Sequence, residues 1–557
     1  MAGPDVSPAR PPSRTIAGEL SAAAAQYPDG IAICYEDERR TFGELRRDVW
    51  QAAEGLVAGG LRPGDRVALW APNTLDAAIG LLAVVVAGGV VVPLNTRYRR
   101  HELTGILQQA CCHMVIAPGS FLGRSFAAEA LAVAGSASVV SLGGHDPAGA
   151  RPWPEIVAAG TEASRQELEA RIGSQSGDDV VVVQYTSGTT GQPKGAVLRQ
   201  GPMLATAATW SEVVGMRHGD VYPVTYPLSH VGGFKTGVLT TLAARATCVL
   251  FPVVNTEALV AAVCAHHPTI VNGPPPVLRS LLSAVGDGLL PASTRIRTVV
   301  TGSAIVPPPL VRDLARVLGV ADVIIAYGLT EATGVCTMTR RGDPLELVCQ
   351  TVGTAIDGVQ VRIAPSPASG GGESPAWAPE GAGRPAGAGE IEVRGPNVMV
   401  GYLDDPAATA EVMNDGWLRT GDVGWIGDDG YVRIVGRVRD MVVVGGFNVY
   451  PAEVEHVLAD HPGVVEAAVV GVPDDRLGEV IVAFVVPSAA SPPTPVALVG
   501  WCRDRLANFK VPRHVWIVES LPRGAVGKIA KADLRVRALA SLGAPGAPAT
   551  RSLPSQA

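Results

Sequence analysis

Lysine is almost missing from this sequence. Of the 45 lysines and arginines in the 557-residue chain, only five are lysines and the other forty are arginines. Arginine therefore supplies the ordinary surface cations. A position that keeps lysine is expected to need a compact, flexible ammonium, which a planar guanidinium does not replace. The five are Lys194, Lys235, Lys510, Lys528 and Lys531.

Paired cysteines, aromatic residues and blocks of like charge are also scarce. The eight cysteines are scattered and none forms a Cys-x-x-Cys pair, which argues against a zinc site or a disulfide framework and favours a reduced, cytoplasmic protein. The net charge is −7, and no basic run is long enough for a nucleic-acid-binding arm. The cluster of Arg97, Arg99, Arg100 and His101 is expected to be a solvated face.

No segment is typical of a secretory signal or a membrane span. The N-terminus, MAGPDVSPARPPSR, has no apolar stretch. The longest apolar segment covers 77–94, but Gly88-Gly89 interrupts it and the residues after the break are β-branched. We therefore expect a buried helix that leads into a buried strand, and no transmembrane segment.

Helical and strand patterns alternate through the first part of the chain. A helical pattern over 42–60 precedes apolar strand patterns at 66–70 and 114–117. This alternation predicts an α/β fold with a largely parallel sheet. The predicted organisation is a disordered tail at 1–13, a large domain at 14–436 with a Gly/Pro/Ala-rich insert at 364–389, a hinge near 436–441, a small C-terminal α+β domain at 437–540 and a disordered tail at 541–557.

The strongest local motif is YTSGTTGQPKG, which runs from Tyr185 to Gly195 and follows an apolar strand. Glycines let a backbone approach an anion and turn its N–H groups toward it, hydroxyls add donors, and the ammonium of Lys194 neutralises charge. The spacing is not that of a Walker A loop. The segment therefore predicts a phosphate-binding loop of another kind.

This loop resembles that of the adenylate-forming superfamily of acyl-CoA synthetases, luciferases and adenylation domains, and further motifs follow in the family's order. They are YPLSH (226–230), TGSA (301–304), YGLTE (327–331), GWLRTGD (416–422), GRVRD (436–440), GGFNVYPAEVE (445–455) and LPRGAVGK (521–528). The resemblance implies a large adenylation domain of α/β layers with a β-barrel-like subdomain, and a small mobile lid. It implies ATP, Mg²⁺ and coenzyme A as cofactors and substrates.

The resemblance also implies roles for individual residues. Lys528, Thr330, Glu331 and His230 are the expected catalytic residues, and Glu331 is the expected Mg²⁺ ligand. Asp440 is the expected hinge. The residues expected to bind ATP or coenzyme A are Thr186, Ser187, Gly188, Thr189, Thr190, Gly191, Lys194, Gly302, Ser303, Ala304, Tyr327, Gly328, Asp422, Arg437, Gly445 and Gly446. Arg476 and Lys510 are candidates for the phosphates of coenzyme A.

Two positions depart from the usual family pattern. Family members often have Gly-Gly-Ala-Pro where this chain has Gly302-Ser303-Ala304-Ile305, and often have Glu where it has Phe447. The first change is expected to alter the floor of the acyl pocket. Lys235, next to the acyl-pocket motif, is a surface lysine, a contact for a polar group of the acyl substrate, or a residue that pairs within the pocket.

The predicted reaction is ATP-dependent activation of a carboxylic acid as an acyl-adenylate, followed by transfer to coenzyme A. The apolar segment at 226–240 favours a fatty acid or an alicyclic, steroid-derived acid, and the chain looks similar to actinobacterial acyl-CoA ligases that act on such acids. Two alternatives stay open: a fatty acyl-AMP ligase that loads a carrier protein, and a degenerate fold that only binds nucleotide or acyl-adenylate. A homodimer is compatible with the sequence.

Overall fold

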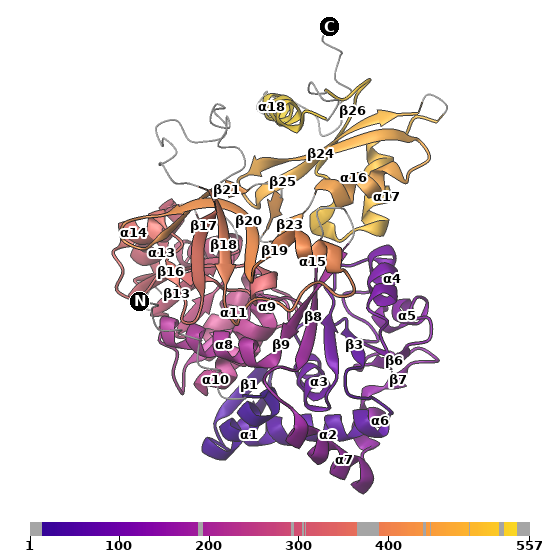
Figure 1. Ribbon diagram of the computed structural model, residues 1–557, viewed down its shortest axis with the longest axis vertical. Coiled ribbons are helices and arrows are strands. Elements are labelled where there is room, and N and C mark those ends of the chain that lie inside the picture. The colour runs from indigo at the N-terminus through magenta and orange to yellow at the C-terminus, as the bar shows by residue number, and fades with distance from the viewer. Residues whose placement is uncertain are drawn as a thin grey trace, which may run out of the picture.

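The chain folds into stacked α/β layers with a separate C-terminal sheet above them (Figure 1). The structure is a computed structural model. It describes residues 14–187, 193–290, 295–303, 306, 308–364, 389–437, 442–445, 447–449, 451–488, 491–522 and 529–542. The predicted α/β class is confirmed.

A seven-stranded sheet organises the N-terminal part. Its strand order is β7-β6-β5-β3-β4-β8-β9, and every neighbouring pair is parallel except β8 and β9. The strands are β3 (Arg66–Leu69), β4 (Val90–Pro93), β5 (Met114–Ala117), β6 (Ser138–Ser141), β7 (Arg151–Pro152), β8 (Val180–Ser187) and β9 (Pro193–Arg199). The predicted buried helix and strand are α3 (Leu75–Val86) and β4, and every α3 residue except Asp76 is buried.

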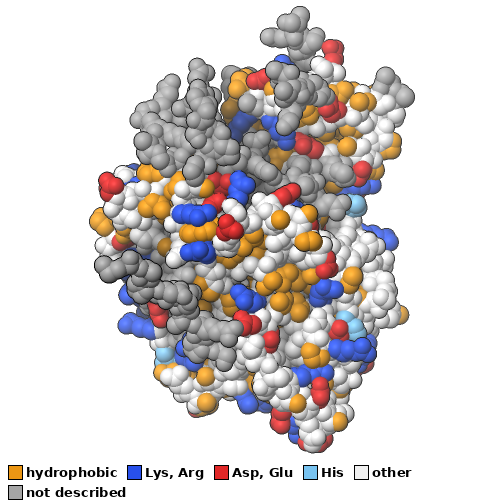
Figure 2. Space-filling model, viewed as in Figure 1, with side chains coloured by type: hydrophobic (Ala, Val, Ile, Leu, Met, Phe, Trp, Pro, Cys, Tyr) orange, Lys and Arg blue, Asp and Glu red, His pale blue; other side chains and the backbone are white. Residues whose placement is uncertain are grey.

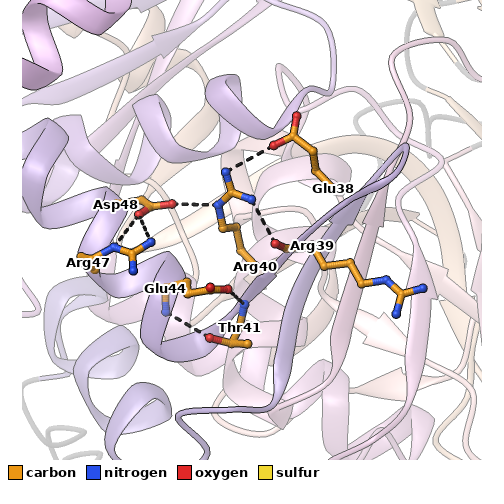
Figure 3. Close-up of polar contacts among 7 residues, drawn as sticks. All are labelled: Glu38, Arg39, Arg40, Thr41, Glu44, Arg47 and Asp48. Atoms are coloured by element: carbon orange, nitrogen blue, oxygen red, sulfur yellow. Dashed lines mark hydrogen bonds and ion pairs between the residues drawn. The ribbon is translucent and has the colours of Figure 1, made fainter.

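Helix α2 (Phe42–Ala58) shows how local sequence fixes a helix start (Figure 3). The Thr41 hydroxyl accepts a hydrogen bond from the Glu44 backbone N–H at 3.2 Å, and the Glu44 carboxylate accepts one from the Thr41 N–H at 2.9 Å. Arg40 then donates to Asp48 one turn further on, at 2.8 Å. This reciprocal cap satisfies two amide groups that would otherwise lack partners, and it aligns α2 against α3.

Two further sheets form the middle of the large domain. One has the order β10-β11-β1-β2 and the other β12-β13-β14-β15-β16. Their strands are β1 (Ile31–Tyr35), β2 (Glu38–Thr41), β10 (Val221–Pro223), β11 (Thr247–Leu250), β12 (Ile270–Asn272), β13 (Thr298–Gly302), β14 (Asp322–Tyr327), β15 (Thr337–Met338) and β16 (Thr354–Ala355). A buried carboxylate, Asp220, joins the two sheets because it accepts hydrogen bonds from Arg297 and Thr269.

An antiparallel sheet follows. Its order is β17-β18-β20-β19, with β21 paired to β20. Its strands are β17 (Gln360–Ala364), β18 (Gly389–Arg394), β19 (Met413–Asn414), β20 (Trp417–Ile426) and β21 (Val432–Arg437). Strands β17 and β18 are direct neighbours, with Ala364 opposite Glu390, so the predicted insert joins two paired strands. Residues 365–388 of that insert lie outside the described part of the chain.

The C-terminal part is built on a sheet of its own, with order β23-β22-β25-β24 and β26 beside β25. Its elements are β22 (Val442–Val444), β23 (Phe447–Val449), α16 (Pro451–Ala459), β24 (Val464–Asp474), β25 (Gly478–Pro487), α17 (Pro495–Arg505), η3 (Asn508–Lys510), β26 (His514–Ile517) and α18 (Lys531–Leu542). In Figure 1 these elements lie above the large domain, and α17 contacts α4 (Arg100–Gln109).

The other helices cover the sheets of the large domain. They are α1 (Ile16–Gln26), α5 (Phe126–Leu131), α6 (Trp153–Ala158), α7 (Glu162–Ser174), α8 (Gln200–Val214), α9 (Val231–Gly233), η1 (Phe234–Leu239), α10 (Thr240–Ala244), α11 (Thr256–His266), α12 (Pro275–Gly286), α13 (Pro308–Leu318), η2 (Thr330–Ala332), α14 (Leu345–Gln350) and α15 (Pro406–Val412). Among the described helices, none combines the length and apolarity needed to cross a bilayer. Figure 2 shows basic and acidic side chains interspersed on one face.

Candidate active site

The candidate phosphate loop connects the two antiparallel strands at the edge of the seven-stranded sheet. Ser187 at the end of β8 pairs with Pro193 at the start of β9, so the intervening loop begins and ends at one point. The Thr186 hydroxyl donates to the backbone oxygen of Lys194 at 3.4 Å. The loop residues Gly188, Thr189, Thr190 and Gly191 lie outside the described residues, as does the side chain of Ser187.

Tyr402 connects the candidate phosphate lysine to the candidate metal carboxylate. The Lys194 ammonium lies 5.3 Å from the centre of the Tyr402 ring and 3.8 Å from the Glu411 carboxylate. The Tyr402 hydroxyl donates to Glu331 at 2.8 Å. Glu331 follows Thr330 in the short helix η2. The backbone oxygen of Glu331 accepts a hydrogen bond from the Met399 N–H, which links η2 to the segment that carries Tyr402. Sequence reasoning did not single out Tyr402.

The candidate nucleotide residues Tyr327 and Asp422 meet although 95 positions separate them. Tyr327 ends β14 and Asp422 lies on β20, and the Tyr327 hydroxyl donates to the Asp422 carboxylate at 2.7 Å. Burial, followed by the Asp422 charge, holds the pKa of Tyr327 well above its ordinary value. The tyrosine therefore stays a neutral donor. Arg437, on β21, lies opposite Asp422 in the strand pairing.

At the ends of β13 and β14, two glycines lie where backbone comes close to backbone. A Cβ at Gly302 would lie 2.1 Å from the Ala326 oxygen, and one at Gly328 would lie 2.5 Å from the Val335 Cα, so both positions require glycine. Ser303 has a φ of +63°, in the left-handed region that glycine adopts more readily. Its hydroxyl lies 3.3 Å from that of Tyr226. Ala304 lies outside the described residues.

The candidate acyl-pocket motif forms a tight loop in which Tyr226 and His230 stack. Their ring centres are 5.6 Å apart and nearly parallel, at 17°. The His230 Nδ1 accepts a hydrogen bond from the Gly232 N–H at 3.0 Å, which places the ring proton on Nε2. Burial, with a smaller contribution from Lys235, lowers the pKa of His230 to about 4. The imidazole is therefore uncharged at neutral pH.

Two buried amide side chains hold this loop in place. The Asn73 side chain donates to the backbone oxygen of Tyr226 at 2.9 Å and accepts from the Leu228 backbone N–H at 2.7 Å. Gln184, on β8, donates to the Ser229 oxygen at 2.9 Å. Both amides belong to the N-terminal sheet region, so the sheet that carries the phosphate loop also positions the acyl loop. No sequence motif pointed to either residue.

The C-terminal domain contacts the large domain through Phe447 and Lys510. The Phe447 ring stacks on Phe509 at 4.5 Å, and the Arg97 guanidinium lies over it at 4.8 Å. The Lys510 ammonium lies 3.1 Å from the Glu102 carboxylate of α4, and both side chains are almost fully buried. Lys510 thus bridges the two domains. In this arrangement the ammonium contacts Glu102, and the expected role of Lys510 at the coenzyme A phosphates stays a prediction.

Other lid predictions fall outside the described part of the chain. The structure does not describe Lys528, Asp440 or Gly446, nor the side chain of Arg437. Gly445 is described, has a φ of +58° and donates its N–H to the Leu477 oxygen at 2.9 Å. Within the described residues, no group of three or more His, Cys, Asp or Glu side chains is placed to hold a metal ion.

The sequence matches two families, described as AMP-binding enzyme over residues 20–403 and AMP-binding enzyme C-terminal domain over residues 453–528. A Mycobacterium tuberculosis protein named 3-[(3aS,4S,7aS)-7a-methyl-1,5-dioxo-octahydro-1H-inden-4-yl]propanoyl:CoA ligase is 41% identical over 527 residues. The alignment covers 94% of this chain and 98% of that protein.

Two structures of o-succinylbenzoate CoA synthetase from Bacillus subtilis are also similar, at 27% identity and 93% coverage of this chain. The structure of a double mutant with the product analogue OSB-NCoA aligns with a TM-score of 0.78 and 98% of its chain covered. The structure with the acyl-adenylate OSB-AMP aligns with a TM-score of 0.63 and 97% covered.

Proposed function

This chain belongs to the AMP-binding enzyme family and is an AMP-forming acyl-CoA ligase, and from that premise we propose that it activates a propanoic acid carried on an alicyclic ring system. The main support for this proposal is the 41% identity to the Mycobacterium tuberculosis ligase over nearly the full length of both proteins. The acyl loop supports it, since 226–240 contains no acidic residue to bind an amino group. Each methylene that the pocket buries contributes about 0.8 kcal/mol.

In the proposed first half-reaction, the substrate carboxylate attacks the α-phosphate of ATP. Two anions must approach, so catalysis consists mainly of charge neutralisation and in-line positioning. Lys194 and the phosphate loop hold the phosphates, Asp422 binds the ribose hydroxyls, Tyr327 stacks on adenine, and Thr330 contacts the α-phosphate. Lys528 bridges the carboxylate and α-phosphate oxygens. His230 remains neutral and lines the acyl side.

Mg²⁺ fits the residues that are present. This ion is usually held by one or two protein carboxylates together with substrate phosphates, rather than by an all-protein cage. Glu331 supplies one carboxylate, and Tyr402 orients it through the 2.8 Å hydrogen bond. The ion would neutralise triphosphate charge there. Lys194, on the other side of Tyr402, adds a second positive charge.

The domain arrangement seen here is assigned to the second half-reaction, in which coenzyme A attacks the acyl-adenylate. The two Bacillus subtilis structures differ in what they bind, and this chain superimposes better on the one with the coenzyme A product analogue. The buried Lys510–Glu102 pair joins the C-terminal domain to the large domain in this same arrangement. For the first half-reaction, rotation about Asp440 would give the C-terminal domain the position in which Lys528 acts.

The test is a substrate panel. The purified enzyme is incubated with ATP, Mg²⁺ and linear, aromatic or alicyclic acids, with either coenzyme A or a holo acyl-carrier protein, and AMP and thioester are measured. We expect acyl-CoA from alicyclic propanoic acids. Carrier-bound product without acyl-CoA would identify a fatty acyl-AMP ligase instead, and an absence of AMP across the panel would identify a binding protein. The relatives favour neither alternative.

Two further properties belong to the proposal. The scattered, unpaired cysteines support a cytoplasmic location, where thiols stay reduced. A homodimer is the assembly to test, and light scattering of the purified protein distinguishes it from a monomer.

A further inference from the structure

Lys235 is a fully buried lysine in an unusual helix. It lies in η1, a π-helical turn inserted between α9 and α10, five residues after His230. Its exposed fraction is 0%. A π-helical turn is rare and is found often at functional sites, because the extra residue changes the direction in which side chains point.

The Lys235 ammonium has no hydrogen-bond partner among the described residues. It lies over the Trp210 ring on α8, 5.2 Å from the ring centre, as in a cation–π contact, and the Trp210 indole N–H is likewise buried without a hydrogen-bond partner in the described part of the chain. The indole N–H is a donor only, and so is the lysine in its ammonium form. Buried donors that lack an acceptor are costly to the folded protein, so a ligand that supplies an acceptor would remove that cost.

No protein anion compensates the charge. The nearby thiol of Cys336 is neutral at pH 7, because burial raises its pKa to about 12. No described carboxylate forms an ion pair with Lys235. Burial accordingly lowers the pKa of Lys235 to about 7, and the nitrogen remains a donor in either protonation state. A methionine would fill this space without that cost, which argues that the amine serves the ligand rather than the fold.

The lysine borders the same region as the reacting groups. A Cβ at Gly334 would lie 3.7 Å from the Lys235 Cε, and Gly334 follows Thr330 by only four positions. Lys235 also lies close enough to His230 for its charge to lower the pKa of that histidine. The segment from Thr330 to Cys336 therefore runs from the candidate catalytic residues to the Lys235 side chain.

We propose that the Lys235 amine and the Trp210 indole N–H bind a carbonyl oxygen on the ring system of the acid, so that the enzyme selects oxo-substituted acids over their hydrocarbon counterparts. This inference rests on the proposed function, since it assigns a specificity determinant of the same acyl site. The related Mycobacterium tuberculosis ligase is named for an acid that carries two oxo groups. A site that hydrogen-bonds a substrate oxygen rejects the analogue that lacks it, because its own donors are then left unpaired.

The test compares two bicyclic propanoic acids that differ only in a ring ketone or a methylene. We expect the wild-type kcat/KM to favour the keto acid by roughly thirtyfold or more. In Lys235→Met the ratio should fall to within about threefold, mainly through loss of the keto acid, while the methylene acid keeps its kcat/KM. Lys531→Met is the matched control, because that lysine pairs with Glu455 in the C-terminal domain, and it should keep the wild-type ratio.

Other outcomes decide against the proposal. An equal fall for both acids in Lys235→Met, or a wild-type ratio near one, overturns it. If Lys235→Met does not fold, Trp210→Phe removes the second donor and should lower the ratio severalfold. If the wild-type enzyme forms acyl-CoA only from linear acids, the ring-acid proposal fails separately. A pair of linear acids with and without a mid-chain ketone then tests Lys235 by the same ratio.

Discussion

Ser303 combines a demanding backbone conformation with a contact to the acyl loop. Its left-handed φ of +63° costs a non-glycine residue about 1 kcal/mol. Its hydroxyl meets that of Tyr226 at 3.3 Å, and Tyr226 stacks on His230. The departure from the family's usual glycine therefore adds a polar link between the turn beside the nucleotide site and the acyl loop.

Substitutions at Ser303 separate the two effects. Ser303→Gly removes the strain and the hydroxyl, whereas Ser303→Ala removes only the hydroxyl. We expect Ser303→Gly to be more stable than Ser303→Ala by about 1 kcal/mol in thermal or denaturant unfolding. Both should lose the same factor in kcat/KM for the acid. Equal stabilities would show that the backbone is not strained, and unequal kinetic losses would show that the hydroxyl is not the relevant contact.

At the residue scale, the sequence motifs named the groups that are expected to contact substrates, but they gave no sign of the side chains that hold the acyl loop in place. Tyr327 and Asp422 belong to motifs, and they do meet in the structure. Asn73 and Gln184 hold the acyl loop through backbone atoms 153 and 45 positions away. An isolated buried amide carries no local pattern, because its partners are set only by the tertiary fold. Tyr402 was not predicted either, because its partner Glu331 lies 71 positions away in the sequence.

At the scale of elements, the contact between η3 and α4 fixes the position of the C-terminal domain. Lys510→Met would remove the ammonium that Glu102 contacts at 3.1 Å, and removing one partner of a buried ion pair is costlier than removing both charges. We expect coenzyme A attack on supplied acyl-adenylate to slow about tenfold, which corresponds to about 1.4 kcal/mol. Adenylation, followed by pyrophosphate release, should change less than about twofold.

A double-mutant cycle gives the control. Glu102 also accepts from the Arg99 N–H at the start of α4, at 3.1 Å, so glutamine is the substitution that best keeps this cap. In Lys510→Met/Glu102→Gln the second half-reaction should recover part of its rate. If the double variant is as slow as the product of the two single losses, the pair does not couple the domains.

The insert at 364–389 joins strands that already pair. Because Ala364 lies opposite Glu390, a short Asn-Gly turn in place of residues 365–388 should preserve the β17–β18 register. We expect the Tm to change by less than about 1 °C, which corresponds to about 1 kcal/mol for a chain of this size. Acyl-CoA formation should be retained. Loss of acyl-CoA formation with an unchanged Tm would instead assign the insert a role in the reaction.

Element boundaries followed from sequence wherever glycine or a cap marked them. The break at Gly88-Gly89 predicted the end of α3 and the start of β4. The π-helical turn η1 could not be predicted, because one extra residue in a helix leaves the hydrophobic pattern nearly unchanged.

At the scale of the whole molecule, the two half-reactions need different positions of the C-terminal domain. Lys528→Ala should lower adenylation, measured as acid-dependent pyrophosphate release, by at least a hundredfold, because the charge between the two anions is removed. Attack of coenzyme A on supplied acyl-adenylate should stay within about threefold of wild type. An equal loss in both assays would contradict a role for Lys528 confined to the first step.

The α/β class followed from the alternating pattern, whereas the relative position of the two domains did not. It depends on contacts such as Lys510 with Glu102, which lie 408 positions apart. No periodic pattern records such a contact, because each side chain contributes only a single position to it.

The scarcity of lysine turns that contact into a built-in reporter. Amine-directed reagents have very few targets here, and the Lys510 nitrogen is shielded while the domains stay docked, whereas Lys531 is a quarter exposed. The rate at which Lys510 acquires a methyl label, read by mass spectrometry and normalised to Lys531, would therefore time domain opening in the unmodified enzyme. ATP, an adenylate analogue or coenzyme A could each be added to find which one lowers the rate at which Lys510 is labelled.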